Sequence, residues 1–150
     1  MKVLYFVVAA QVAFAIDAGQ YRILSLGKAN SDLVAPEGED SRRSPVLLPR
    51  HKFVWELEAR DGGFTIKAPT TGLYISPPSI PTHPVMMTQI PHVWDFQSYL
   101  GEPNIFQLSP HGQPSHALAE LQLPGPPYKV GLQPNVTTDD ISQMWYFSGR

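Results

Sequence analysis

The sequence contains no cysteine. Disulfide bonds, a thiol nucleophile and thiolate metal ligands are therefore excluded. Small secreted domains usually depend on disulfides for stability, so this chain must be stabilised by packing alone if it is exported. A closed β-barrel would meet that demand, because closure leaves no strand edge unpaired.

Charge is also scarce. Only 16% of the residues are charged, and the formal net charge is −2. The sequence has no basic stripe of the kind that binds nucleic acid, so we expect no nucleic-acid partner. In contrast, 43% of the residues are apolar, which is enough for one core in a single domain.

Proline and glycine are abundant, with sixteen prolines and eleven glycines in 150 residues. Both residues interrupt regular structure, so this frequency argues against long helices. It is typical of short strands that are separated by tight turns.

The first fifteen residues have the pattern of a secretory signal. Lys2 precedes an apolar stretch, and Ala13-Phe14-Ala15 supplies small residues at a cleavage site. The stretch is too short to span a bilayer, which needs about 20 apolar residues. We expect a leader at 1–15, one domain at 16–150, a secreted protein, and no membrane association after cleavage. The alternative is a further strand or a misassigned start, with a cytoplasmic protein.

A motif ending in tryptophan recurs three times. Each tryptophan lies two residues before a Leu or Phe, at Trp55, Trp94 and Trp145. Val46 and Val85 each precede the next tryptophan by nine residues, whereas Val130 precedes Trp145 by fifteen. A period of roughly 40 residues indicates three structural units. The longer spacing predicts an insertion before the last strand of the third unit.

Strand patterns occur four times in each unit. In residues 53–68, apolar and polar side chains alternate on both sides of Asp61-Gly62-Gly63, which predicts a hairpin. The twelve predicted strands are 20–26, 32–35, 45–48, 53–59, 63–68, 73–76, 84–88, 93–98, 104–108, 117–121, 128–132 and 144–148. Twelve strands in three pseudo-repeats, without helices, predict an all-β fold, the β-trefoil.

The predicted core consists of apolar and aromatic positions on these strands. They are Tyr21, Ile23, Val46, Leu48, Trp55, Leu57, Phe64, Ile66, Val85, Met87, Trp94, Phe96, Phe106, Val130, Leu132, Trp145 and Phe147. We interpret the tryptophans as core residues and not as a platform for a ligand.

The chain from Gly19 onward resembles the small β-trefoil serine protease inhibitors of mushrooms. The resemblance rests on Gly19-x-Tyr-x-Ile23, Trp55-x-Leu57, Gly63-Phe-Thr-Ile66 and the terminal Trp145-x-Phe147. It implies a fungal inhibitor that presents a surface loop to the cleft of a serine protease. We expect a monomer that needs no cofactor. A trypsin-like protease would take an Arg or Lys, because its specificity pocket is acidic.

The resemblance directs attention to the loop between the second and third strands, residues 36–45. Within it, Arg42, Arg43 and Ser44 are candidates for protease contact. The alternative is a solvated loop in which the arginines pair with Glu37, Glu39 and Asp40. Lys28, in the first connection, is a further candidate.

The insertion in the third unit, residues 133–143, offers another candidate in Asn135, which we expect at its tip. Asn135-Val136-Thr137 is also an N-glycosylation acceptor. A glycan there would block a protease cleft, so the two roles of Asn135 exclude each other.

A carbohydrate-binding function is the alternative. Gln143-x-Trp145 matches the Gln-x-Trp signature of ricin-type β-trefoil lectins, but the first two units lack the glutamine. No unit assembles an early Asp, a stacking aromatic and a late polar partner. The five histidines show no metal-ligand spacing, and no serine follows a nucleophile-elbow pattern. We therefore expect no metal site and no enzymatic activity.

Overall fold

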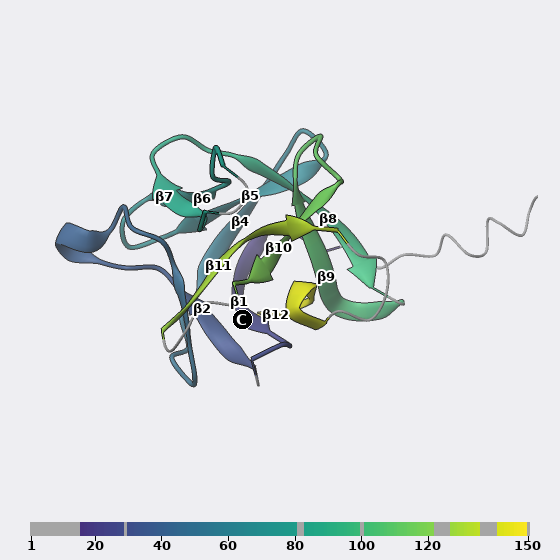
Figure 1. Ribbon diagram of the computed structural model, residues 1–150, viewed down its shortest axis with the longest axis horizontal. Helices are drawn as coiled ribbons and strands as arrows, with labels where there is room; N and C mark the ends of the chain where they lie inside the picture. The colour runs from purple at the N-terminus through teal and green to yellow at the C-terminus, as the bar shows by residue number, and fades with distance from the viewer. Residues whose placement is uncertain are drawn as a thin grey trace, which may run out of the picture.

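Short strands separated by turns make up the computed structural model, which describes residues 16–28, 30–80, 83–99, 101–121, 127–135 and 141–149 (Figure 1). Within these residues there are twelve strands. They are β1 (Gly19–Ser25), β2 (Ser31–Val34), β3 (Val46–Leu48), β4 (Trp55–Arg60), β5 (Gly63–Ala68), β6 (Leu73–Ser76), β7 (Met86–Thr88), β8 (Val93–Tyr99), β9 (Glu102–Pro110), β10 (His116–Glu120), β11 (Tyr128–Pro134) and β12 (Trp145–Gly149). Two 3-10 turns, η1 (Gly38–Asp40) and η2 (Ile141–Gln143), complete the regular structure of this part of the chain.

Six of the strands close into a barrel. Antiparallel pairing runs from β1 to β4, β5, β8, β9 and β12, and β12 pairs again with β1. The other six form three hairpins, β2–β3, β6–β7 and β10–β11. Each unit of four strands thus gives two strands to the barrel and one hairpin. This arrangement is a β-trefoil, as predicted.

The three tryptophans occupy equivalent places. All three are fully buried. Their indole nitrogens donate to the carbonyls of Leu33, Ile75 and Leu118 at 2.8, 3.1 and 2.9 Å, one in the hairpin of each unit. Each tryptophan therefore joins the last barrel strand of its unit to the hairpin of the same unit. This repeated bond explains the recurring tryptophan, and the Leu or Phe two residues later packs in or against the core in each unit.

Aromatic rings fill the barrel next to these tryptophans. One ring comes from each of five barrel strands, and neighbouring centroids lie 5.1–6.1 Å apart. The five residues are Tyr21, Phe64, Phe96, Phe106 and Phe147. Edge-to-face and tilted contacts at these distances add to the stabilisation from burial. The prediction that these side chains point inward is confirmed, although Tyr21, Phe64 and Phe96 are only partly buried.

One part of the predicted core is wrong by one residue. Leu47 is buried, whereas Val46 and Leu48 are only half-buried. Leu33 pairs with Leu47 in the first unit, just as Ile75 pairs with Met87 in the second. The position of Met87 is thus equivalent to that of Leu47, and the equal spacing from Val46 and Val85 to their tryptophans is a coincidence. A one-residue shift in register exchanges the two faces of a strand.

The predicted insertion in the third unit is confirmed. β11 ends at Pro134 and β12 begins at Trp145, whereas only six residues separate β3 from β4 and four separate β7 from β8. The predicted leader at 1–15 lies outside the described residues, as do residues 136–140 within the insertion. No helix among the described residues is long and apolar enough to cross a membrane.

Candidate functional site

The loop between β2 and β3 projects from the body of the barrel, and its 3-10 turn lies at the far left in Figure 1. Its base is buried at Ala35 and at Pro45. Between them the backbone folds into consecutive turns, since the amides of Asp40, Ser41 and Arg43 each donate to the carbonyl three residues earlier. The loop therefore has buried ends and a turn-rich, exposed middle.

The two arginines of this loop differ in their contacts. Arg43 Nε lies 3.2 Å from Asp40 Oδ1, and both side chains are well exposed. Arg42 is also exposed, and it forms no ion pair within the described residues. The expected pairing of the arginines with acidic neighbours thus holds for Arg43. Exposed pairs of this kind contribute little, about 0–1 kcal/mol, so Arg43 can readily exchange partners.

Ser44 is buried, unlike the two arginines before it. Its hydroxyl lies 3.4 Å from Met86 Sδ, at the start of β7. The chain thus leaves the surface directly after Arg43, and Ser44 fixes the loop to the second unit. Of the three candidates in this loop, only the arginines are available to a partner.

Lys28 lies in the turn between β1 and β2, and its ammonium group is not free. Nζ lies 3.3 Å from Glu120 Oε2 and 4.0 Å from the centroid of the Tyr128 ring. Glu120 is buried in β10, and its Oε2 has no hydrogen-bond partner, so the two charges are close without being aligned. Lys28 thus connects the first unit to the third, which makes it a poor residue for a protease pocket.

Asn135 does not stand at a loop tip, contrary to expectation. It directly follows β11, and its backbone amide donates to the carbonyl of Ser115 at 2.8 Å. Its side-chain Nδ2 donates to the carbonyl of Pro114 at 3.0 Å. Asn135 therefore ties the start of the insertion to the turn between β9 and β10.

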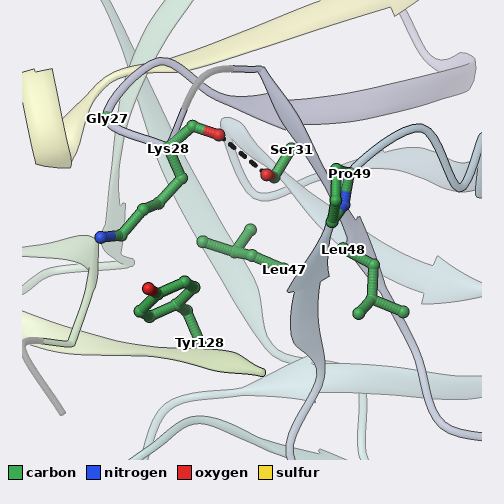
Figure 2. A pocket seen from close by; sticks show the side chains of 7 residues that line it. All are labelled: Gly27, Lys28, Ser31, Leu47, Leu48, Pro49 and Tyr128. Atoms are coloured by element: carbon green, nitrogen blue, oxygen red, sulfur yellow. Dashed lines mark hydrogen bonds between the residues drawn. The ribbon is translucent and has the colours of Figure 1, made fainter. Parts of the chain in front are cut away.

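A hollow of about 470 Å³ opens beside Lys28. Figure 2 shows its lining, which comes from the β1–β2 turn, from the end of β3 and from the start of β11. The residues are Gly27, Lys28, Ser31, Leu47, Leu48, Pro49 and Tyr128. Most of this surface is apolar. The sequence pattern did not single out the hollow, because its walls come from segments about a hundred residues apart.

Gln143, the glutamine of the lectin-like signature, has a structural role. It is buried, accepts a hydrogen bond from Gln107 at 2.9 Å and donates to the carbonyl of Pro134 at 2.9 Å. The side chain therefore holds the insertion against β9. It is not exposed to a sugar.

A histidine and a carboxylate form an exposed pair near the turn after β9. His111 Nδ1 lies 2.8 Å from Asp95 Oδ1, and the amide of Gly112 donates to Asp95 Oδ2 at 3.2 Å. The hydrogen bond to Asp95 raises the pKa of His111 above 6.5. No group of three His, Asp or Glu side chains in the described part of the chain could hold a metal ion.

Comparison with solved structures finds the same fold in several proteins. A ricin B-like lectin of Macrolepiota procera in complex with lactose is 18% identical, with a TM-score of 0.75 over 91% of this chain and 99% of the lectin. A proteinase inhibitor from Coprinopsis cinerea is 15% identical, with a TM-score of 0.70 over 91% of this chain and all of the inhibitor. The agglutinin of Rhizoctonia solani is 17% identical, with a TM-score of 0.72 over 93% of this chain and all of the agglutinin.

No model of a known protein family and no curated protein sequence matches the chain. TM-scores of 0.70–0.75 over nearly complete chains demonstrate the shared fold, and identities below 20% leave function open. These structures include members of both classes that the sequence resembles, namely a proteinase inhibitor and lectins.

The structure adds residues that the sequence pattern did not reveal. Met86 contacts the hydroxyl of Ser44, 42 residues earlier in the sequence. The Tyr128 ring contacts the ammonium group of Lys28, 100 residues earlier. Glu120 did carry a signal, because it is charged in an otherwise apolar run from Ala117 to Leu121. Such a carboxylate within a buried strand requires a cationic partner.

Proposed function

We propose that the protein is a serine protease inhibitor that offers the β2–β3 loop to the protease cleft. The observation that carries this proposal is the exposed pair Arg42 and Arg43 on a projecting loop whose two ends are buried in the fold. Fixed loop ends reduce the conformational entropy that is lost when the loop docks.

Arg42 is the residue that we propose for the specificity pocket. It lies in the turn that the hydrogen bond from Arg43 to Asp40 closes, and it makes no ion pair within the described residues. A trypsin-like pocket would supply the carboxylate that Arg42 lacks. Arg43, which Asp40 holds weakly, is suited to a second contact on the protease surface.

The loop is not in the extended conformation in which a substrate-like inhibitor loop would enter a protease cleft. Its consecutive turns run from Glu37 to Arg43, and β3 begins only after the buried residues Ser44 and Pro45. Docking in a substrate-like manner would require the turn at Asp40 to open. That turn is held by one backbone hydrogen bond and one exposed ion pair, so opening it costs about 1–2 kcal/mol.

A sugar-binding function receives less support. The side chain of Gln143 is hydrogen-bonded to Gln107 and to the carbonyl of Pro134, and the 470 Å³ hollow is mainly apolar. A sugar site needs several polar partners around an exposed aromatic face. We therefore propose protease binding, and not sugar binding, as the function.

One paired experiment tests this assignment. The purified protein would be assayed against a panel of serine and cysteine proteases and passed over immobilised galactose and lactose. We expect 1:1 inhibition of a trypsin-like serine protease and no retention on either sugar. Retention on lactose without inhibition of any protease would reverse the assignment.

A further inference from the structure

We propose that the hollow beside Lys28 is a binding site for a small, uncharged, amphipathic molecule with an apolar body and an oxygen-bearing head. The site is separate from the β2–β3 loop, and the inference is independent of protease inhibition. Its volume of about 470 Å³ is within the range of small-molecule sites.

The two ends of the hollow differ in polarity. Leu48 and Pro49 lie at one end, Lys28 Nζ and the phenolic oxygen of Tyr128 lie at the other, and Leu47 lies between them (Figure 2). A ligand that buries an apolar ring or chain against the leucines would place its head near the two polar groups. Because the polar and apolar parts of the lining are separated, we expect the ligand to be amphipathic.

Each of the two polar groups keeps an unused donor for such a head, although the Lys28 ammonium is paired with Glu120. Lys28 makes no aligned hydrogen bond through Nζ with the described residues, because its contacts there are a charge pair with Glu120 and the face of the Tyr128 ring. The phenolic oxygen of Tyr128 likewise has no hydrogen-bond partner among those residues. Both groups can donate to an oxygen on the ligand.

Glu120 is the reason that we expect the head of the ligand to be uncharged. This carboxylate is only 3% exposed and lies 3.3 Å from Lys28 Nζ, so it already compensates the ammonium charge. An anionic head would lose its hydration in a largely apolar space and would meet a cation that is already paired. A carbonyl or hydroxyl head accepts the same hydrogen bonds and loses far less solvation.

Acetophenone and benzoate test the proposal as a matched pair, because they share a ring and differ in the charge of the head. Each would be titrated into the isotope-labelled protein and followed by amide chemical shifts. We expect acetophenone to shift resonances of Gly27, Leu48 and Tyr128 with a dissociation constant in the roughly millimolar range of a fragment. Benzoate should bind at least about threefold more weakly.

Two variants and a control locate the site. Leu48→Ser removes apolar wall, and Tyr128→Phe removes only the hydroxyl, so each should weaken acetophenone binding by about threefold or more. Ile90→Ser removes a side chain that is 65% exposed and lies outside the hollow, so it should leave binding unchanged. Unaltered shift dispersion would establish that each variant is folded.

Three results would overturn the proposal. The first is the absence of shifts around the hollow up to the solubility limit of acetophenone. The second is benzoate binding as tightly as acetophenone. The third is lactose, titrated in parallel, perturbing the same resonances while acetophenone does not, which would point to a sugar site.

Discussion

Arg22 donates two hydrogen bonds to the carboxylate of Asp32, from Nε to Oδ2 at 2.9 Å and from a terminal nitrogen to Oδ1 at 2.8 Å. Asp32 is completely buried. The pair joins the first barrel strand to the hairpin from which the arginine loop projects. It also raises the pKa of Arg22 above its ordinary value, chiefly through these hydrogen bonds.

Replacing Arg22 by Ala should destabilise the protein by about 3 kcal/mol, because it leaves a buried carboxylate without its cation. Urea denaturation followed by tryptophan fluorescence would measure the loss. Arg60→Ala, at an exposed position in β4, is the control and should change stability by less than about 0.5 kcal/mol. Equal stability of both variants would show that the Arg22–Asp32 pair contributes nothing.

The three tryptophans should respond alike to substitution. Changing Trp55, Trp94 or Trp145 to Phe removes the indole donor of a buried hydrogen bond to a hairpin carbonyl. Each change should cost about 1–3 kcal/mol in free energy of unfolding, including the smaller ring. Tyr146→Phe, next to Trp145 and 37% exposed, is the control. A tryptophan whose replacement by Phe costs no stability would break the threefold equivalence.

These tryptophans also explain how much of the fold was predictable. Each tryptophan is buried and hydrogen-bonded in the same way. The same spacing to Leu or Phe therefore recurs in the sequence, and this recurrence indicates three units. The register of β3 was not predictable, because Val46, Leu47 and Leu48 are all apolar and give no alternation. Only the pairing of Leu47 with Leu33 decides which face is buried.

The candidate site was less predictable than the fold. Exposure of Arg42 and Arg43 follows from a polar segment bounded by prolines. The burial of Ser44 and the ion pair of Lys28 could not be predicted from the sequence. Their partners, Met86 and Glu120, are brought close only by the tertiary structure.

The pair of His111 and Asp95 predicts a pH dependence. Asp95 raises the pKa of His111 in the folded state above the value of about 6.5 expected when unfolded. The stabilisation is therefore complete below about pH 6.5 and is lost as pH rises through the folded-state pKa. A proton-detected titration of the His111 ring should give a pKa above 6.5. Asp95→Asn should lower it, and an unchanged pKa would contradict the pairing.

Export remains a prediction. Expressed in a eukaryotic secreting host, the chain should begin at or near Ile16 and carry one glycan on Asn135. Ile16 packs against the core, so cleavage after Ala15 keeps that contact. A glycosylated Asn135 retains one N–H for its bond to Pro114. N-terminal sequencing and intact mass would decide the matter. A protein that keeps Met1 and has no glycan would contradict both expectations.

Inhibition by the arginine loop is tested most directly by the inhibition constant of Arg42→Ala/Arg43→Ala against trypsin. The control is Arg60→Ala/Lys129→Ala, which removes two exposed positive charges outside the loop. We predict that the first variant binds trypsin at least about 2 kcal/mol more weakly, with Arg42→Ala alone causing most of the loss, while the control inhibits like the parent protein. Undiminished inhibition by the first variant would show that this loop does not contact the protease.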